Sequence, residues 1–150
     1  RTSGIQRTFA RPTPCSAEIV PPRSATAGRT SAAIASGSFR TMGMIVAPCS
    51  MRTLAAIAFT AADNLLVRAA DVTLKERRPL VLLARESPLH LGHLRAMATV
   101  TEMGGIVAPP MPSFYRRPQS VAEIIDHIAR RAIGHLGIGS IAPAEEWRGR

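Results

Sequence analysis

The sequence predicts an α/β fold with a parallel sheet flanked by helices, incomplete in its N-terminal half. Three short apolar runs, at 43–47, 80–84 and 106–108, each end within a few residues of a proline. Such runs are typical of strands buried in a parallel sheet. Segments with helical spacing separate them, which is the alternation of an α/β domain. A doubly wound domain normally has about five or six strands and opens with a strand and a glycine-rich turn, and we find neither opening feature.

The composition indicates one globular domain. The chain has 150 residues, of which 46% are hydrophobic and 19% charged, and this length is enough to bury a core. No apolar run approaches the roughly 20 residues of a membrane span. The two cysteines, Cys15 and Cys49, belong to no spaced metal or disulfide framework. We therefore expect a cytoplasmic protein without a metal site.

The positive charge does not indicate nucleic-acid binding. The formal charge is +9, of which residues 1–30 contribute +4, and the rest is scattered in arginine pairs such as Arg77-Arg78 and Arg130-Arg131. Only 4% of the residues are aromatic, so few side chains could stack on bases. Dispersed arginine pairs are better suited to small phosphorylated or carboxylated ligands.

Residues 1–30 form a separate segment. They are rich in Arg, Pro, Ser and Thr and show neither a helical nor a strand period. Such a segment cannot bury enough apolar surface to offset its ordering entropy, so we expect it to be disordered. The domain is therefore expected to lie within 31–150, beginning with a short helix that runs into Ser36-Gly37-Ser38.

The turn after the first strand is a candidate phosphate site. Ser50-Met51-Arg52-Thr53 follows the strand at 43–47 and begins a helix. A strand, a small-residue turn and a helix aim backbone N–H groups and the helix dipole at a phosphate. The alternative is that Ser50 only caps the helix. The helix is expected to continue over 53–77, with Asp63 as a cap and Lys75 near its end, where Lys75 either faces solvent or contacts a phosphate.

The central strand at 80–84 places Arg85 and Glu86 at its carboxyl end. Ligands of open α/β sheets lie in the crevice beyond the carboxyl ends of the strands. Arg85 would supply a forked cation there, and Glu86 a carboxylate able to move a proton. The alternative is that the two side chains pair with each other on the surface.

Two further helices are expected. The first spans 89–103; its His90 and His93 lack acidic or cysteine partners at ligand spacing, so we assign them to capping or subunit contacts. The rigid loop 109–112 then holds Ser113-Phe114-Tyr115 over the crevice. Ser120 and Glu123 form a capping box for the last helix, from which Arg130 or Arg131 should reach the site or a neighbouring subunit. Trp147 follows in a tail and either packs on the body or covers a ligand.

Three stretches resemble the flavin prenyltransferases. They are SGSFRTMGMIVAPCSMRTLAAIA, DNLLVRAADVTLKERRPLVLLARESPLHLGHLRAM and PPMPSFYRRPQS, and the resemblance covers about 31–147. It implies a Rossmann-like domain whose trimers assemble into a dodecamer. It also implies a metal-free reaction that joins the dimethylallyl group of dimethylallyl phosphate to N5 and C6 of reduced FMN. The product, prenylated FMN, serves a UbiD-type decarboxylase in ubiquinone biosynthesis or aromatic-acid decarboxylation.

The resemblance also implies roles for individual residues. Glu86 matches the acid that assists proton movement and phosphate departure, and Lys75 matches a catalytic group that also holds the substrate phosphate. Arg85 matches an FMN contact near that phosphate. The remaining matches are Ser50, Met51, Arg52 and Thr53 in the FMN-binding turn, Tyr115 and Arg131 at dimethylallyl phosphate, and Ser36 and Trp147 as pocket-lining positions.

One departure from the family bears on activity. The family opens with a strand, a Gly-Ser-Gly-type phosphate loop and a second strand, and residues 1–30 resemble none of them. We therefore expect an exposed sheet edge, an aggregation hazard, and little activity from this chain. The alternatives are a flavin-dependent decarboxylase of the related cysteine-decarboxylase group, which Lys75, Tyr115 and Arg131 argue against, and a non-catalytic subunit.

Overall fold

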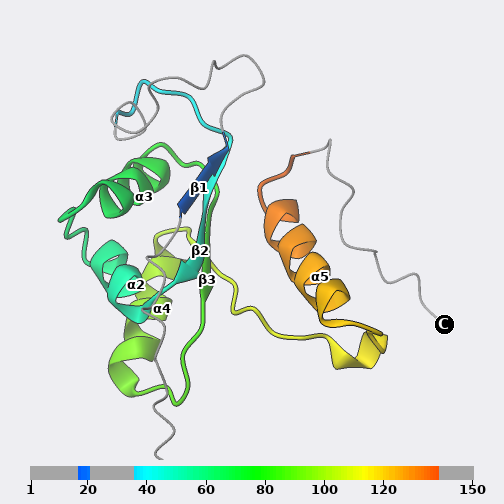
Figure 1. The fold of residues 1–150 in the computed structure, drawn as a ribbon. Helices are drawn as coiled ribbons and strands as arrows, with labels where there is room; N and C mark the ends of the chain where they lie inside the picture. Colours follow the sequence, from blue (N-terminus) through cyan, green and yellow to red (C-terminus); the bar gives the residue numbers. More distant parts are fainter. Residues whose placement is uncertain (1–16, 21–35, 139–150) are drawn as a thin grey trace, which may run out of the picture.

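The structure is a computed structural model that describes residues 17–20 and 36–138 (Figure 1). Its elements, in chain order, are β1 (Ala17–Val20), β2 (Gly43–Cys49), α2 (Met51–Ala58), α3 (Leu65–Lys75), β3 (Leu80–Ala84), α4 (Leu91–Glu102), β4 (Ile106–Val107), the short 3-10 helix η1 (Phe114–Arg116) and α5 (Val121–Gly134). Among the described residues, no helix combines the length and the apolar character of a membrane span.

The three predicted strands form a parallel sheet. The order is β1-β2-β3-β4, with β2, β3 and β4 parallel to one another. Met44 pairs with Leu80, and Val81 pairs with Ile106. The carboxyl ends of these strands therefore meet at one edge of the sheet, as the sequence predicted.

The fourth strand, β1, was not predicted. Residues 17–20 lie in the segment expected to be disordered, yet they pair antiparallel with β2, from Ala17 opposite Val46 to Val20 opposite Gly43. The unpaired N–H and C=O groups on the edge of β2 are satisfied by this pairing, and Ile19 and Val20 are residues that favour strands. The edge that we expected to be exposed is thus covered. The helix predicted at 31–35 and the remainder of 1–30 lie outside the described residues.

Each face of the sheet has its own helices (Figure 1). Helices α2, α3 and α4 cover one face, and α5 stands on the other. Side chains alternate between the faces along each strand. Val46 and Leu82 pack in the cluster under the three helices, and Val81 packs on the other face with Ala132 and Leu136 from α5 and the turn that follows it.

The helix predicted over 53–77 is two helices. The break contains Thr60 and Ala62, whose φ angles of 52° and 46° are incompatible with a continuing α-helix. The cap of α3 is Asn64 rather than Asp63, because the Asn64 side chain accepts a hydrogen bond from the Val67 N–H at 3.0 Å. Asp63 instead accepts a hydrogen bond from the Asn64 amide at 2.8 Å.

Ser50 caps α2, as predicted. Its Oγ accepts a hydrogen bond from the Thr53 N–H at 3.1 Å. Replacing Ser50 by alanine is expected to lower the free energy of unfolding by about 1 kcal/mol, because one N–H at the helix start loses its partner. Urea denaturation would measure this change. Ser87→Ala is the control, since Ser87 caps no described helix, and equal stability of the two variants would contradict the capping role.

Candidate functional site

The first group of predicted site residues lies at the carboxyl edge of the sheet. Cys49 pairs with Ala84 across β2 and β3, so the residues that follow them, Ser50 and Arg85, leave the sheet side by side. Ser50, Arg52, Arg85 and Glu86 are exposed there, and Thr53 is half-buried. The Met51 side chain differs, because it is buried in the core beneath α2. Any contact of Met51 with a ligand must therefore come from its backbone.

Glu86 and Arg85 do not pair with each other among the described residues. Glu86 Oε1 accepts from the Ser87 N–H at 3.2 Å, and within the described part of the chain no ion pair joins Glu86 to Arg85. The Ser50 hydroxyl lies 3.0 Å from Thr53 Oγ1. Exposed hydroxyls, a helix start and the guanidinium groups of Arg52 and Arg85, which form no ion pair with another described residue, suit an anion. These residues fit the phosphate of a flavin mononucleotide.

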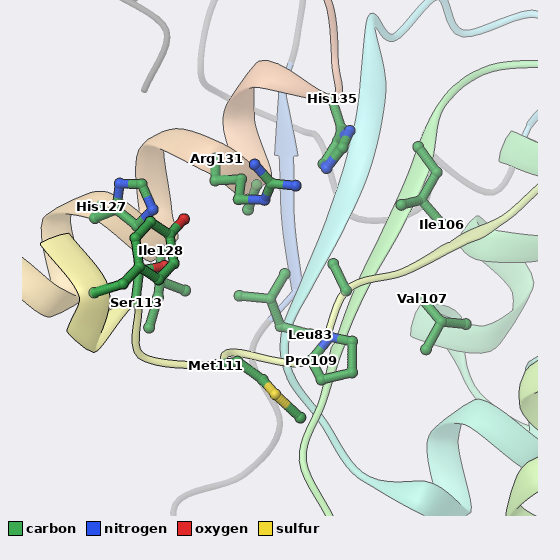
Figure 2. A pocket seen from close by; sticks show the side chains of 13 residues that line it. Leu83, Ile106, Val107, Pro109, Met111, Ser113, His127, Ile128, Arg131 and His135 are labelled. Atoms are coloured by element: carbon green, nitrogen blue, oxygen red, sulfur yellow. The ribbon is translucent and has the colours of Figure 1, made fainter. Parts of the chain in front are cut away.

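The second group lines a pocket on the face of α5 (Figure 2). The pocket has a volume of about 500 Å³ and is lined by residues of β3, β4, the loop 108–113, η1 and α5. Its apolar lining consists of Leu83, Ile106, Val107, Ala108, Pro109, Met111, Ile128 and Ala132, and its polar lining of Ser113, Tyr115, His127, Arg131 and His135. Of the sequence-predicted residues, the structure brings Tyr115 and Arg131 together here.

The two arginines of α5 have different surroundings. Arg130 Nε lies 2.6 Å from Asp126 Oδ2. The hydrogen bond from Arg130 holds the pKa of the Asp126 carboxyl below its ordinary value, and the same bond raises the pKa of Arg130. Arg131 lines the pocket, and no carboxylate is among the described lining residues. Arg131 is therefore the arginine that reaches the site, and its charge is available to an anion.

The third group lies at the opposite edge of the sheet. Lys75 ends α3, shortly before the amino end of β3. Its Nζ lies 2.6 Å from Glu76 Oε1, and the hydrogen bond from Lys75 lowers the pKa of Glu76. The same ammonium would lie 3.1 Å from a Cβ placed on Gly37, so Lys75 adjoins the loop that contains Ser36. Lys75 does not line the pocket of Tyr115 and Arg131, and one chain alone does not bring these residues together.

Arg78 tethers the loop that contains Gly37 and Phe39 to the rest of the domain. Its guanidinium donates to Phe39 O at 2.7 Å and to Gly37 O at 3.1 Å. Replacing Arg78 by methionine is expected to cost about 1 to 3 kcal/mol of unfolding free energy, since two charge-assisted hydrogen bonds from a half-buried group are lost. Thermal and urea unfolding would measure it. The neighbouring Arg77→Met is the control, and a loss of stability of the same size in both variants would argue against the tether.

Two predicted features outside these groups can also be placed. His90 caps α4, as predicted, because its Nδ1 accepts from the Gly92 N–H at 3.0 Å. Its ring stacks on that of His93 with centroids 3.5 Å apart. No group of three or more His, Cys, Asp or Glu side chains suited to a metal occurs in the described ranges. Trp147 lies outside the described residues.

Sequence reasoning missed His127 and His135 as pocket residues. They stand four residues before and four residues after Arg131, and positions at that spacing share one face of a helix. That spacing was visible in the sequence. It was overlooked because the apolar period of α5 and its arginine pair were interpreted alone.

Comparisons with known proteins show the family of the chain. A family described as Flavoprotein matches residues 16–132. The match includes β1, so it begins within the segment 1–30, whereas the resemblance was expected to begin at about residue 31. The flavin prenyltransferase UbiX of Neisseria meningitidis is 57% identical over 122 residues, which cover 81% of this chain and 64% of that protein. A probable UbiX-like flavin prenyltransferase of Bacillus subtilis is 58% identical over 118 residues, covering 79% and 57%.

Solved structures give the same family. A crystal structure of AnUbiX (PadA1) in complex with FMN and dimethylallyl pyrophosphate has a TM-score of 0.72 at 48% identity, covering 79% of this chain and 62% of that one. A dodecameric FMN-dependent Ubix-like decarboxylase of Escherichia coli O157:H7 has a TM-score of 0.72 at 44% identity, covering 87% and 66%. The chain spans 57% to 64% of the length of the two curated relatives above. It belongs to the flavoprotein family, and its sequence is similar to those of the flavin prenyltransferases.

Proposed function

We propose that this chain acts as a flavin prenyltransferase. It transfers the dimethylallyl group of dimethylallyl phosphate to reduced FMN, and the prenylated FMN then serves a UbiD-type decarboxylase, in ubiquinone biosynthesis or aromatic-acid decarboxylation. The observation that carries this proposal is the pocket of about 500 Å³, in which an apolar lining adjoins Tyr115 and Arg131. A short branched hydrocarbon with a phosphate at one end matches both parts of that lining.

In this reaction, the main task of the chain's residues is to stabilise the leaving group. When the allylic C–O bond breaks, the phosphate departs as an anion, and Arg131 can hold its oxygens while the Tyr115 hydroxyl donates to one of them. Reduced FMN, when bound, supplies the ring atoms N5 and C6 that accept the dimethylallyl group. Ser50, Arg52, Thr53 and Arg85 would bind and orient the flavin at the carboxyl edge. The exposed carboxylate of Glu86 would move a proton there.

We propose that Lys75 acts in the site of a neighbouring copy. It lies at the amino edge of the sheet, with Gly37 and away from Arg131, so it can meet the substrate phosphate only from another chain. Exposed apolar side chains on η1 and α5 support such an assembly: Phe114 is 69% exposed, Val121 71% and Ile125 61%. Side chains of this kind are expected at an interface. A homo-oligomer, such as the dodecamer named for the Escherichia coli relative, would cover them.

A second candidate function is decarboxylation. The Escherichia coli relative is named a decarboxylase, and so is a phenylacrylic acid decarboxylase of Aquifex aeolicus, whose structure has a TM-score of 0.68 at 44% identity. The Arg131 guanidinium could hold a carboxylate as well as a phosphate. Lys75 and Tyr115 add donors that suit a phosphate better, because a phosphate offers three oxygens.

Incubation with reduced FMN would separate the two candidates. The purified chain is mixed anaerobically with reduced FMN and dimethylallyl phosphate, or with reduced FMN and an arylacrylic acid. Mass spectrometry then detects prenylated FMN, and gas analysis detects carbon dioxide. Prenylated FMN above a protein-free control, even if formed slowly, supports prenyl transfer. Release of carbon dioxide without prenylated FMN would favour the decarboxylase.

We also propose the reducing cytoplasm as the place of action. The two cysteines of the chain, Cys15 and Cys49, belong to no spaced disulfide framework. The lack of such a framework is typical of proteins that are kept in a reducing compartment.

A further inference from the structure

We propose that His127 and His135 are further phosphate-binding residues, which flank Arg131 and make the grip on the substrate dependent on pH. The inference rests on the proposed function, because it concerns the same pocket. Both histidines line that pocket together with Arg131 and Tyr115. The proposed function uses Tyr115 and Arg131 and assigns no role to either imidazole.

The placement of the three side chains supports a shared ligand. His127, Arg131 and His135 stand on successive turns of α5 and its C-cap, about 6 Å apart along the helix axis, and they face the same pocket (Figure 2). The flexible Arg131 lies between the two rings in this column. A phosphate that is held by Arg131 therefore lies within reach of an imidazole on either side.

The imidazoles are also free to bind. Within the described residues, neither His127 nor His135 takes part in a hydrogen bond that would occupy a ring nitrogen. His127 is half-buried and His135 is exposed, so an entering ligand can contact both. Each protonated ring would add one N–H donor toward the phosphate oxygens.

The charges around the column leave the imidazoles to set the pH dependence. The described lining residues from β3, β4 and the loop that follows are apolar except for the uncharged Ser113, and η1 contributes only the Tyr115 phenol. On α5 itself, Asp126 is engaged with Arg130, and Glu123 accepts from the Gln119 N–H at 2.8 Å. Histidine is the residue type in this described lining whose charge ordinarily changes between about pH 5 and 8.

The affinity for dimethylallyl phosphate is expected to pass through a maximum as the pH changes. Protonated histidines are lost as the pH rises, and the phosphate dianion is lost below its second pKa, near 6. Binding of dimethylallyl phosphate should therefore be strongest near about pH 6.5 and weaker at pH 8. We expect the difference to be about tenfold, which is within the range of one or two charge-assisted hydrogen bonds.

Calorimetric titration with dimethylallyl phosphate tests the inference. The full chain, His127→Gln, His135→Gln, the double variant and Arg130→Gln are compared at pH 6.5 and 8.0, with circular dichroism as the check on folding. The expected result is that the double variant binds equally at the two pH values, with the weaker affinity, whereas Arg130→Gln keeps the dependence of the parent chain. The glutamine side chain retains a donor but cannot gain charge, so a merely structural role would not abolish the pH dependence.

The outcomes separate this inference from the proposed function. If the parent chain binds equally at both pH values, or if the double variant keeps the parent's dependence, the histidines are not phosphate ligands, although the proposed function stands. If the parent chain binds no dimethylallyl phosphate at either pH, the proposed function fails together with this inference. NMR adds a direct reading, because the ring signals of both histidines should change when dimethylallyl phosphate is added.

Discussion

Replacing Arg131 by alanine is expected to weaken the binding of dimethylallyl phosphate by about 10- to 100-fold. Arg131 is the one arginine among the described lining residues of the pocket, and no described carboxylate there neutralises it. A hydrogen bond to a charged group contributes about 1.5 to 3 kcal/mol, which corresponds to this range of affinity. Calorimetry on the parent chain and the variant at one pH would measure the change.

The neighbouring arginine is the matched control for this prediction. Arg130→Ala removes the same charge one residue away, but Arg130 is engaged with Asp126 at 2.6 Å and does not line the pocket. We expect its affinity to stay within about twofold of the parent, since only long-range attraction in water changes. If both variants lost affinity for dimethylallyl phosphate equally, the loss would come from the change in net charge. The prediction that Arg131 contacts the phosphate directly would then be wrong.

Replacing Lys75 by alanine is expected to slow prenyl transfer by about 100-fold or more. A cation at the departing phosphate stabilises charge that develops in the transition state, and the loss of one such group has effects of this order. The rate of prenylated FMN formation would be measured. Arg77→Ala is the control, because Arg77 is also an exposed cation beyond α3, and Arg77 is assigned no contact with the substrate.

The position of Lys75 leads to a second and more specific prediction. Lys75 ends α3 and Arg131 lies in α5, and these two helices lie on opposite faces of the sheet (Figure 1). A site that uses both residues must therefore draw on two chains. Lys75→Ala and Arg131→Ala, each with reduced activity, should regain part of the activity after they are unfolded together and refolded as a mixture. Mixed assemblies that form and yet show no regained activity would contradict a site shared between chains.

Much of the fold was predictable from short-range patterns. The apolar runs predicted β2, β3 and β4, and Ser50 and Ser120 were recognised as caps because their side chains bond to N–H groups three residues ahead. The strand β1 was not predictable, because its order depends on pairing with β2, and that pairing is long-range. The break between α2 and α3 was missed because Thr60 and Ala62 carry no local signal for a positive φ.

The candidate site was predicted in its parts and not in its arrangement. Parallel strands end at one edge, so Ser50 and Arg85 could be placed together from the sequence. Tyr115 and Arg131 were selected by the family resemblance. The number of residues between them in the sequence does not tell how far apart they lie in the fold. Lys75 was expected beside them, but the direction of α3 carries it to the other edge of the sheet.

A structure of the chain with dimethylallyl phosphate bound is the measurement that bears most directly on the proposed function. The account predicts phosphate oxygens within hydrogen-bond distance of the Tyr115 hydroxyl and the Arg131 guanidinium, with the hydrocarbon against the apolar lining near Leu83 and Met111. A ligand bound elsewhere, with this pocket left to solvent at saturating concentration, would contradict it.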